Sequence, residues 1–216
     1  MTSGRGVTFS TEDFHQALLA LDSEIAKSKN LRAAAPIKLL SAGGFVAVTL
    51  FHNRNSTQDI DYIIDPDTKN VTKVKEKLQK AISAVAQKRG LVEKWINSRM
   101  EVFAVGETKR HLFYDSIAQG VVLWQGTNLI IYAAKWEWSL ARKLKRIGSE
   151  RRHIDVSDAV EIPAQMVQQN GGPLSYELVK SWNTIVYTPL DDAAIKQVAE
   201  AFVTRFGYAV SQLLEN

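Results

Sequence analysis

The pattern of apolar residues changes near residue 134, and this change limits the folds that the chain can adopt. Before it, short apolar runs of strand length alternate with segments that repeat every three to four residues. After it, apolar residues recur only at helical spacing, through segments 136–147, 156–168, 175–187 and 191–214. We therefore expect an α/β (α+β) region over residues 1–133, followed by a C-terminal helical region over residues 134–216 that packs against it.

Within the first region, periodicity and turn residues predict the individual elements. A helix is expected from Thr11, behind a Ser10 or Thr11 cap, and a long charged helix at 71–88 should stop at Gly90. The segment 45–51 fits a helix better than a strand, because another strand candidate follows too closely for a simple hairpin. The expected strands lie at 37–40, 59–64, 100–105, 121–124 and 129–132. In the second region, Pro163 is expected to break or kink its helix.

The composition excludes several classes of protein. The sequence has no cysteine, so disulfides, thiolate metal sites and cysteine nucleophiles are absent. It has no stretch approaching the roughly eighteen consecutive apolar residues of a membrane span, and no apolar run follows Arg5, so we expect neither a membrane partner nor a secretory signal peptide. A cytosolic or nuclear location fits by default, and we expect a cytoplasmic one. No Gly-x-Gly-x-x-Gly or Gly-Lys-Ser/Thr motif is present, which argues against a dinucleotide fold or a P-loop.

The net charge of +4 is concentrated in one short segment. Between Arg142 and His153, six basic residues accompany a single acid, Glu150, so this dozen residues holds all the excess positive charge. The concentration indicates a local anion site, and a solvated helix face is the alternative explanation.

Two glycines and two aspartates carry the sharpest chemical signal. Gly43 and Gly44 follow the apolar run at 37–40, at an expected strand-to-helix junction where backbone N–H groups can approach a phosphate closely. Asp59 and Asp61 lie one residue apart on the next expected strand, so they point to the same face and can hold magnesium jointly. A half-exposed edge strand is the alternative for the aspartates, but the preceding glycine pair favours a site.

These residues resemble the first motif of the nucleotidyltransferase fold superfamily. That motif is a glycine-glycine or glycine-serine turn, a short helix, and an Asp-x-Asp or Asp-x-Glu strand. The stretch 54–61, Arg-x-x-Thr-x-Asp-Ile-Asp, is similar to the AbiEii-like toxin branch and to related uncharacterised bacterial and fungal proteins. The resemblance implies a nucleotidyltransferase-like mixed sheet flanked by helices.

Later residues extend the likeness from about Ile37 to Ile162 and leave the C-terminal quarter unexplained. Trp95, Ile96 and Asn97 resemble a Trp-Leu-Asn stretch of those relatives, and Lys143 with Leu144 resembles their helical Lys-Leu pair. A third stretch of those relatives, Arg-x-x-Asp or Lys-Asp-x-x-Asp, is similar to the residues Arg152, Asp155 and Asp158 of this chain.

The resemblance implies a magnesium-dependent transfer of a nucleoside monophosphate from a nucleoside triphosphate to a hydroxyl acceptor. The implied catalytic and metal-binding residues are Asp59 and Asp61, with Lys143 neutralising the triphosphate and Asp155 at the site. The implied nucleotide-binding residues are Ser41, Gly43, Gly44, Arg54 and Thr57, again with Lys143. For Lys143 a surface helix lysine is the alternative. Asp155 and Asp158 lie three residues apart and could orient Lys143 or cap the helix, and for Asp158 we favour the cap.

The sequence departs from the superfamily pattern at the third carboxylate, which polymerising members carry on a later strand. Glu101, next to the expected strand 102–105, is the best candidate, and Ser98 stands where relatives with the Trp-Leu-Asn stretch often have Asp. A non-catalytic nucleotide- or RNA-binding protein of the same fold is therefore the main alternative, and a toxin-like component is another. The acceptor is left open between RNA or tRNA, a protein hydroxyl and a small molecule, and so is the base of the nucleotide.

Overall fold

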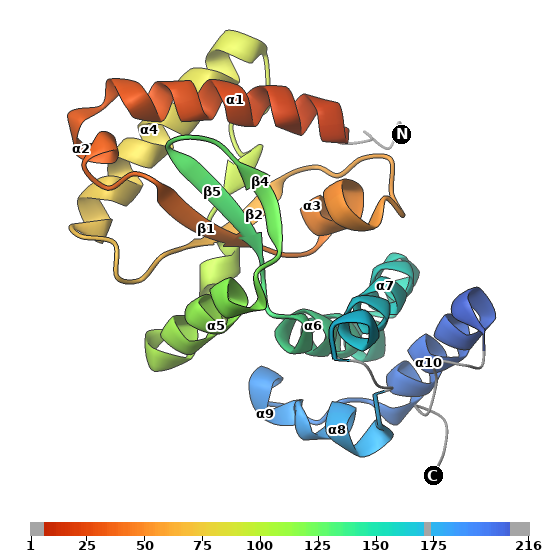
Figure 1. The fold of residues 1–216 in the computed structure, drawn as a ribbon. Coiled ribbons are helices and arrows are strands. Elements are labelled where there is room, and N and C mark those ends of the chain that lie inside the picture. The colour runs from red at the N-terminus through yellow and green to blue at the C-terminus, as the bar shows by residue number, and fades with distance from the viewer. Residues whose placement is uncertain (1–6, 171–173, 208–216) are drawn as a thin grey trace. The chain divides into compact units, whose positions relative to one another are not determined.

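The computed structural model describes residues 7–170 and 174–207 (Figure 1). The contacts of the chain divide it into two compact units, Met1–Ala134 and Lys135–Asn216. The boundary expected after residue 133 differs from this division by one residue. The first unit is α+β and the second is helical, as the hydrophobic pattern predicted.

In the first unit, the described strands form one mixed sheet in the order β3-β2-β1-β5-β4. The strands are β1 (Ile37–Ser41), β2 (Ile60–Ile64), β3 (Ile96–Asn97), β4 (Val122–Gln125) and β5 (Leu129–Ala133). The central strand β1 pairs antiparallel with β2 and parallel with β5. At the edges, β3 is parallel to β2 and β4 is antiparallel to β5. The expected mixed sheet is confirmed.

One face of this sheet forms the main core of the unit. Helices α1 (Thr11–Lys27) and α4 (Val71–Arg89) lie on this face, and α5 (Gly106–Gln119) lies on the other side of the sheet (Figure 1). The alternate residues of β2 that enter this core are Ile60, Tyr62 and Ile64. Because side chains alternate along a strand, Asp61 faces away from α1 and α4.

Sequence signals at helix ends are confirmed in detail. Ser10 caps α1 and forms a capping box with Asp13. Gly90 ends α4 in the left-handed conformation, with φ of 66°. The helix expected at 45–51 is also present, as α3 (Gly44–Val46) followed by a π-helical turn, η1 (Ala47–Phe51). A short helix, α2 (Lys29–Arg32), follows α1.

The strand expected at 100–105 is wrong. The chain forms a 3-10 helix there, η2 (Arg99–Phe103), and α5, which the sequence analysis did not predict, follows it. Within this run only Met100 and Ala104 are buried, and Val102, which would share their face in a strand, is exposed. Val102 and Val105 are more than 70% exposed, so the apolar pattern of the run does not reflect burial.

The second unit is helical throughout its described residues, as expected. Its helices are α6 (Trp136–Glu150), α7 (His153–Asn170), α8 (Tyr176–Ser181), α9 (Asn183–Val186) and α10 (Asp192–Phe206). The expected helix 175–187 is two short helices, and α7 continues through Pro163 without a break. Residues 208–214 of the last expected helix lie outside the described residues. Among the helices of residues 7–170 and 174–207, none has the length and apolar character needed to span a membrane.

Candidate functional site

The glycine turn, Gly43 and Gly44, connects the end of β1 to the start of α3. Gly43 has φ of 77° and ψ of −133°, a backbone conformation that is essentially restricted to glycine. An ideal Cβ at this position would meet no atom within 4 Å, so the backbone conformation, and not a lack of space, accounts for this glycine. The turn therefore has no side chain at Gly43, and the space beside its backbone is open.

Gly44 is required for a different reason, which is its close contact with Thr57. A Cβ added to Gly44 would lie 2.1 Å from Thr57 Oγ1 and 2.8 Å from Thr57 Cβ. The backbone of Thr57 is itself fixed, because its N–H donates to the Phe9 carbonyl at 3.0 Å and its carbonyl accepts from the Phe9 N–H at 2.7 Å. Thr57 thus packs against the glycine turn, and the two expected nucleotide-binding positions lie together.

Ser41 connects the glycine turn to the strand that carries the aspartates. Its side chain is fully buried, and its Oγ donates a hydrogen bond of 2.8 Å to the backbone carbonyl of Asp61. In the antiparallel pairing of β1 with β2, Ser41 lies opposite Tyr62. The hydroxyl proton is therefore used within the sheet, where it ties the end of β1 to the start of β2. The structure thus places Ser41, the glycine turn, Thr57 and Asp61 at one end of the sheet.

Asp59 precedes β2, and its side chain contacts Asn97 of β3 and Arg99 of η2. Its Oδ2 accepts a hydrogen bond of 3.0 Å from Asn97 Nδ2 and lies 3.7 Å from Arg99 Nη1. Its Oδ1 has no hydrogen bond or ion pair within the part of the chain that the structure describes. The Asp59 side chain is 25% exposed, so one oxygen is positioned by the protein and the other is available to a ligand.

Asn97 of β3 lies beside the aspartates, whereas the third carboxylate was expected at Glu101. In the parallel pairing of β2 with β3, Asn97 is the register partner of Asp61. Its side chain is 8% exposed, and its Oδ1 accepts a 3.1 Å hydrogen bond from the backbone N–H of Arg99. Both ends of the amide are therefore engaged, with the donor end directed to Asp59.

Glu101, the expected third carboxylate, lies in the 3-10 helix η2, and the strand expected directly after it is not formed. Its carboxylate contacts Lys75 Nζ at 2.5 Å and Lys109 Nζ at 2.9 Å, which links η2 to α4 and α5. Burial raises the pKa of this carboxyl, but the hydrogen bonds from the two lysines outweigh burial, and the net pKa lies below its ordinary value. Burial, with a smaller contribution from the Glu101 charge, raises the pKa of Tyr62 to about 12.

In the described residues no group of three or more acidic or histidine side chains is placed to hold a metal ion, so Glu101 does not complete a cluster with the two aspartates. Arg54, the remaining expected residue of the first unit, is half-buried in the loop between η1 and β2.

In the second unit, Lys143 lies in a buried ionic cluster. Its Nζ contacts Asp155 Oδ1 at 2.7 Å and Asp158 Oδ2 at 2.5 Å, and both aspartate side chains are only 1% exposed. Arg146 Nη2 and Arg152 Nε lie 3.1 Å and 3.6 Å from Asp155 Oδ2. Lys143 is thus neither a surface lysine nor an isolated charge. The role expected for Asp158 as a helix cap is wrong, because α7 begins at His153 and the Asp158 side chain contacts Lys143.

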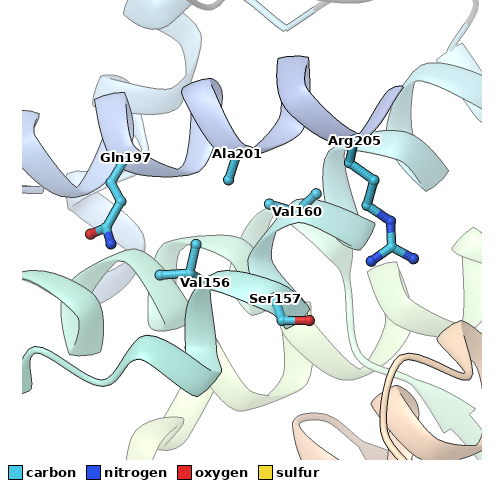
Figure 2. Close-up of a pocket in the computed structure, with 6 residues that line it drawn as sticks. All are labelled: Val156, Ser157, Val160, Gln197, Ala201 and Arg205. Atoms are coloured by element: carbon cyan, nitrogen blue, oxygen red, sulfur yellow. The ribbon is translucent and has the colours of Figure 1, made fainter. Parts of the chain in front are cut away.

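The second unit also contains a cavity of about 370 Å³ between α7 and α10 (Figure 2). Val156, Val160 and Ala201 point into the space, and Gln197 and Arg205 lie toward its two ends (Figure 2). Arg205 is already paired with Glu161, whose pKa is raised by burial in spite of that arginine. None of the residues selected from the sequence lines this cavity.

Comparisons of the chain with models of protein families, with curated proteins and with solved structures found no match in any of the three. The geometry of the first unit is therefore the basis on which a function is inferred.

Sequence reasoning missed one residue of this geometry and used another only for resemblance. Arg99 was not singled out, because an arginine just before the expected strand 100–105 is an ordinary surface residue. Asn97 was noted as part of a Trp-Ile-Asn stretch, but its contact with Asp59 depends on the pairing of β2 with β3. The signal available in the sequence was the Trp-Ile-Asn stretch, whose last two residues form β3. Because β3 is parallel to β2, its polar residue lies beside the aspartates.

Proposed function

We propose that the first unit binds a nucleoside triphosphate with magnesium and transfers the nucleoside monophosphate to a hydroxyl acceptor. The observation that carries this proposal is the arrangement around Ser41. The Ser41 hydrogen bond holds the glycine turn at the end of β1 beside Asp61 of β2, the strand that Asp59 precedes. A bare backbone turn and two carboxylates on one strand face are thus adjacent in a single sheet.

The donor set of this site fits magnesium. Mg²⁺ in nucleotide sites is typically bound by one or two protein carboxylates together with substrate phosphates and water. Asp59 and Asp61 supply two carboxylates, and the Asn97 hydrogen bond to Asp59 Oδ2 is the type of contact that orients a metal-binding carboxylate. A third acidic ligand is not required for such a magnesium–triphosphate complex.

The roles proposed for the site residues follow from the oxygen atoms whose negative charge changes during the reaction. In nucleotidyl transfer the acceptor hydroxyl loses its proton to a base, its oxygen bonds to the α-phosphorus, the bond to the bridging oxygen breaks, and pyrophosphate leaves with that electron pair. Magnesium would supply charge stabilisation for the entering and leaving oxygens. The backbone N–H groups of Gly43 and Gly44 bind phosphate oxygens, and Arg54 contributes a cation from the adjacent loop. Lys143 is not included among the residues that neutralise the triphosphate, because Asp155 and Asp158 already neutralise its charge.

A second candidate function, nucleotide or RNA binding without turnover, is favoured by a specific observation. The register partner of Asp61 is an amide, Asn97, and Glu101 is bound by two lysines that hold its pKa low. Neither side chain is a strong base for the proton of an acceptor hydroxyl. The acceptor under the first proposal is RNA or tRNA, a protein or a small molecule, and a toxin-like role fits either function.

The test is incubation of the purified chain with each α-labelled nucleoside triphosphate and Mg²⁺, followed by a search for label on protein, RNA and small molecules. The same protein is examined for retained triphosphate and for a magnesium-dependent rise in melting temperature, since a ligand that binds only the folded state stabilises it. Transfer supports the enzyme, and retention without transfer supports the binding protein.

The matched variants are Asp59→Asn with Asp61→Asn, and Asp67→Asn as the control. Asp67 lies in the turn after β2, at the other end of this strand from Asp59, and is paired with Arg110 at 2.8 Å, so its substitution removes a carboxylate of the same unit without touching the site. We expect the double variant to lose both the magnesium-dependent stabilisation and any transfer, while the control keeps them. An unchanged response of the double variant to magnesium would remove the two aspartates from the proposed metal site.

A further inference from the structure

Arg99 differs from the other charged residues near the aspartates in how it is attached. It begins η2, is separated from β3 by Ser98 alone, and its backbone N–H is fixed by Asn97 Oδ1 at 3.1 Å. Its side chain is nevertheless 64% exposed, with Nη1 3.7 Å from Asp59 Oδ2. The residue therefore combines a fixed backbone with an exposed guanidinium group beside a carboxylate of the proposed site.

The contact between Arg99 and Asp59 is weak and easily exchanged. A separation of 3.7 Å is a loose ion pair, and exposed pairs of this kind contribute little because solvent and salt screen them. The Asn97 hydrogen bond, in contrast, is shorter and comes from a buried amide that is held at both ends. When a second cation approaches Asp59, the arginine is the partner that can leave.

We propose that Arg99 is the counter-ion of Asp59 in the cation-free protein and becomes a triphosphate ligand when a divalent cation binds. The inference rests on the proposed function, because it requires the cation at Asp59 and Asp61. A divalent cation at Asp59 repels the guanidinium group, which then carries an unpaired charge at the rim of the site. Phosphate oxygens match the planar donor geometry of arginine, so the released group binds the triphosphate.

The charges around β2 are consistent with such an exchange. Asn97 gives Asp59 a neutral donor where a third carboxylate would add a negative charge, so the site carries the two negative charges of Asp59 and Asp61. One divalent cation balances these two charges. A guanidinium group from the same chain then meets the remaining phosphate charge.

The exchange predicts opposite effects of one substitution on two ligands. Arg99→Ala removes the cation that competes for Asp59, so Mn²⁺, used as the probe in the absence of nucleotide, should bind about two- to fivefold more tightly. The same variant lacks a charge-assisted phosphate contact, so a non-hydrolysable triphosphate at saturating Mn²⁺ should bind about tenfold more weakly. A residue with a merely structural role would weaken both ligands or neither.

The experiment measures both affinities by calorimetry for the wild type, Arg99→Ala, Arg99→Gln and the control Arg110→Ala. Arg110 is 51% exposed and pairs with Asp67, so the control removes the same charge from the same unit. The expected result is tighter Mn²⁺ and weaker triphosphate binding in both Arg99 variants and no change in the control. Unchanged or weaker Mn²⁺ binding in the Arg99 variants, or unchanged triphosphate binding, overturns the inference.

The double variant Asp59→Asn with Asp61→Asn separates this result from the proposed function. If the wild type binds Mn²⁺ and the double variant does not, the metal site stands even when the Arg99 variants show no exchange. If the wild type binds no Mn²⁺, the proposed site and the exchange are both refuted. Melting temperatures of the Arg99 variants within a few degrees of the wild type confirm that the exposed side chain does not support the fold.

Discussion

The buried cluster around Lys143 makes a strong prediction about the stability of the second unit. Lys143 contacts two aspartates that are each 1% exposed, Asp155 and Asp158. Removing the charged partner from a buried ion pair typically costs about 3–5 kcal/mol, because a buried charge loses its compensation. Lys143→Met keeps the apolar stem of the side chain and removes only the charge, so it isolates this effect.

The neighbouring arginines place the expected loss at the lower end of that range. Arg146 and Arg152 still contact Asp155 after the substitution, at 3.1 Å and 3.6 Å. We therefore expect Lys143→Met to lower the free energy of unfolding by about 3 kcal/mol. Urea unfolding followed by far-ultraviolet circular dichroism measures this loss through the shift of the midpoint at constant slope.

Two further variants test the reasoning. Adding Asp155→Asn and Asp158→Asn to Lys143→Met removes the uncompensated charges, so most of the lost stability should return. The control is Lys196→Ala on α10, where the lysine is 73% exposed and 3.9 Å from Glu200; it should change stability by less than about 0.5 kcal/mol. A loss under about 1 kcal/mol for Lys143→Met, or a triple variant no more stable than the single one, would refute the argument.

Two more substitutions test contacts in the first unit. Gly44→Ala should destabilise the protein by about 1–3 kcal/mol, since its Cβ would lie 2.1 Å from Thr57 Oγ1. Adding Thr57→Gly should recover part of that loss in urea unfolding, and strictly additive losses would contradict the contact. Glu101→Gln should lower stability at pH 7. The folded-state pKa of Glu101 is lowered, so its stabilisation is present above its ordinary pKa of 4.5 and disappears as the pH falls through the folded-state value. A stability difference from wild type that stays constant between pH 7 and pH 3 would count against this assignment.

The sequence predicted those parts of the fold that local rules determine. The capping box at Ser10, the stop at Gly90 and the alternation along β2 depend on residues within a few positions of one another. The region from 99 to 119 was misread because α5 buries few of its residues, chiefly Leu112, Phe113 and Ser116, and so has a weak helical period. Where burial is slight, periodicity carries little information about the element.

Contacts between residues far apart in the sequence could not be predicted in the same way. Asp22 of α1 accepts hydrogen bonds from the backbone N–H groups of Asn128 and Leu129, at 2.7 Å and 3.0 Å, and thereby fixes the turn before β5. Nothing in the local sequence of Asp22 distinguishes it from an exposed helix residue. The position of Lys143 between two buried aspartates likewise depends on how α6 and α7 pack.

The same limit applies to the candidate site, and it explains why two functions remain in competition. The glycine turn and the two aspartates could be recognised because each lies on one short segment, and the roles proposed for them are nucleotide and metal binding. Turnover depends in addition on a group that accepts the acceptor's proton, and such a group comes from a neighbouring strand or helix. In this chain the neighbouring positions hold Asn97, which is not a base, and Glu101, whose low pKa makes it a weak one. Under the proposed function, binding and transfer therefore depend on different residues, so the enzyme is distinguished from the binding protein by label transfer and not by triphosphate affinity.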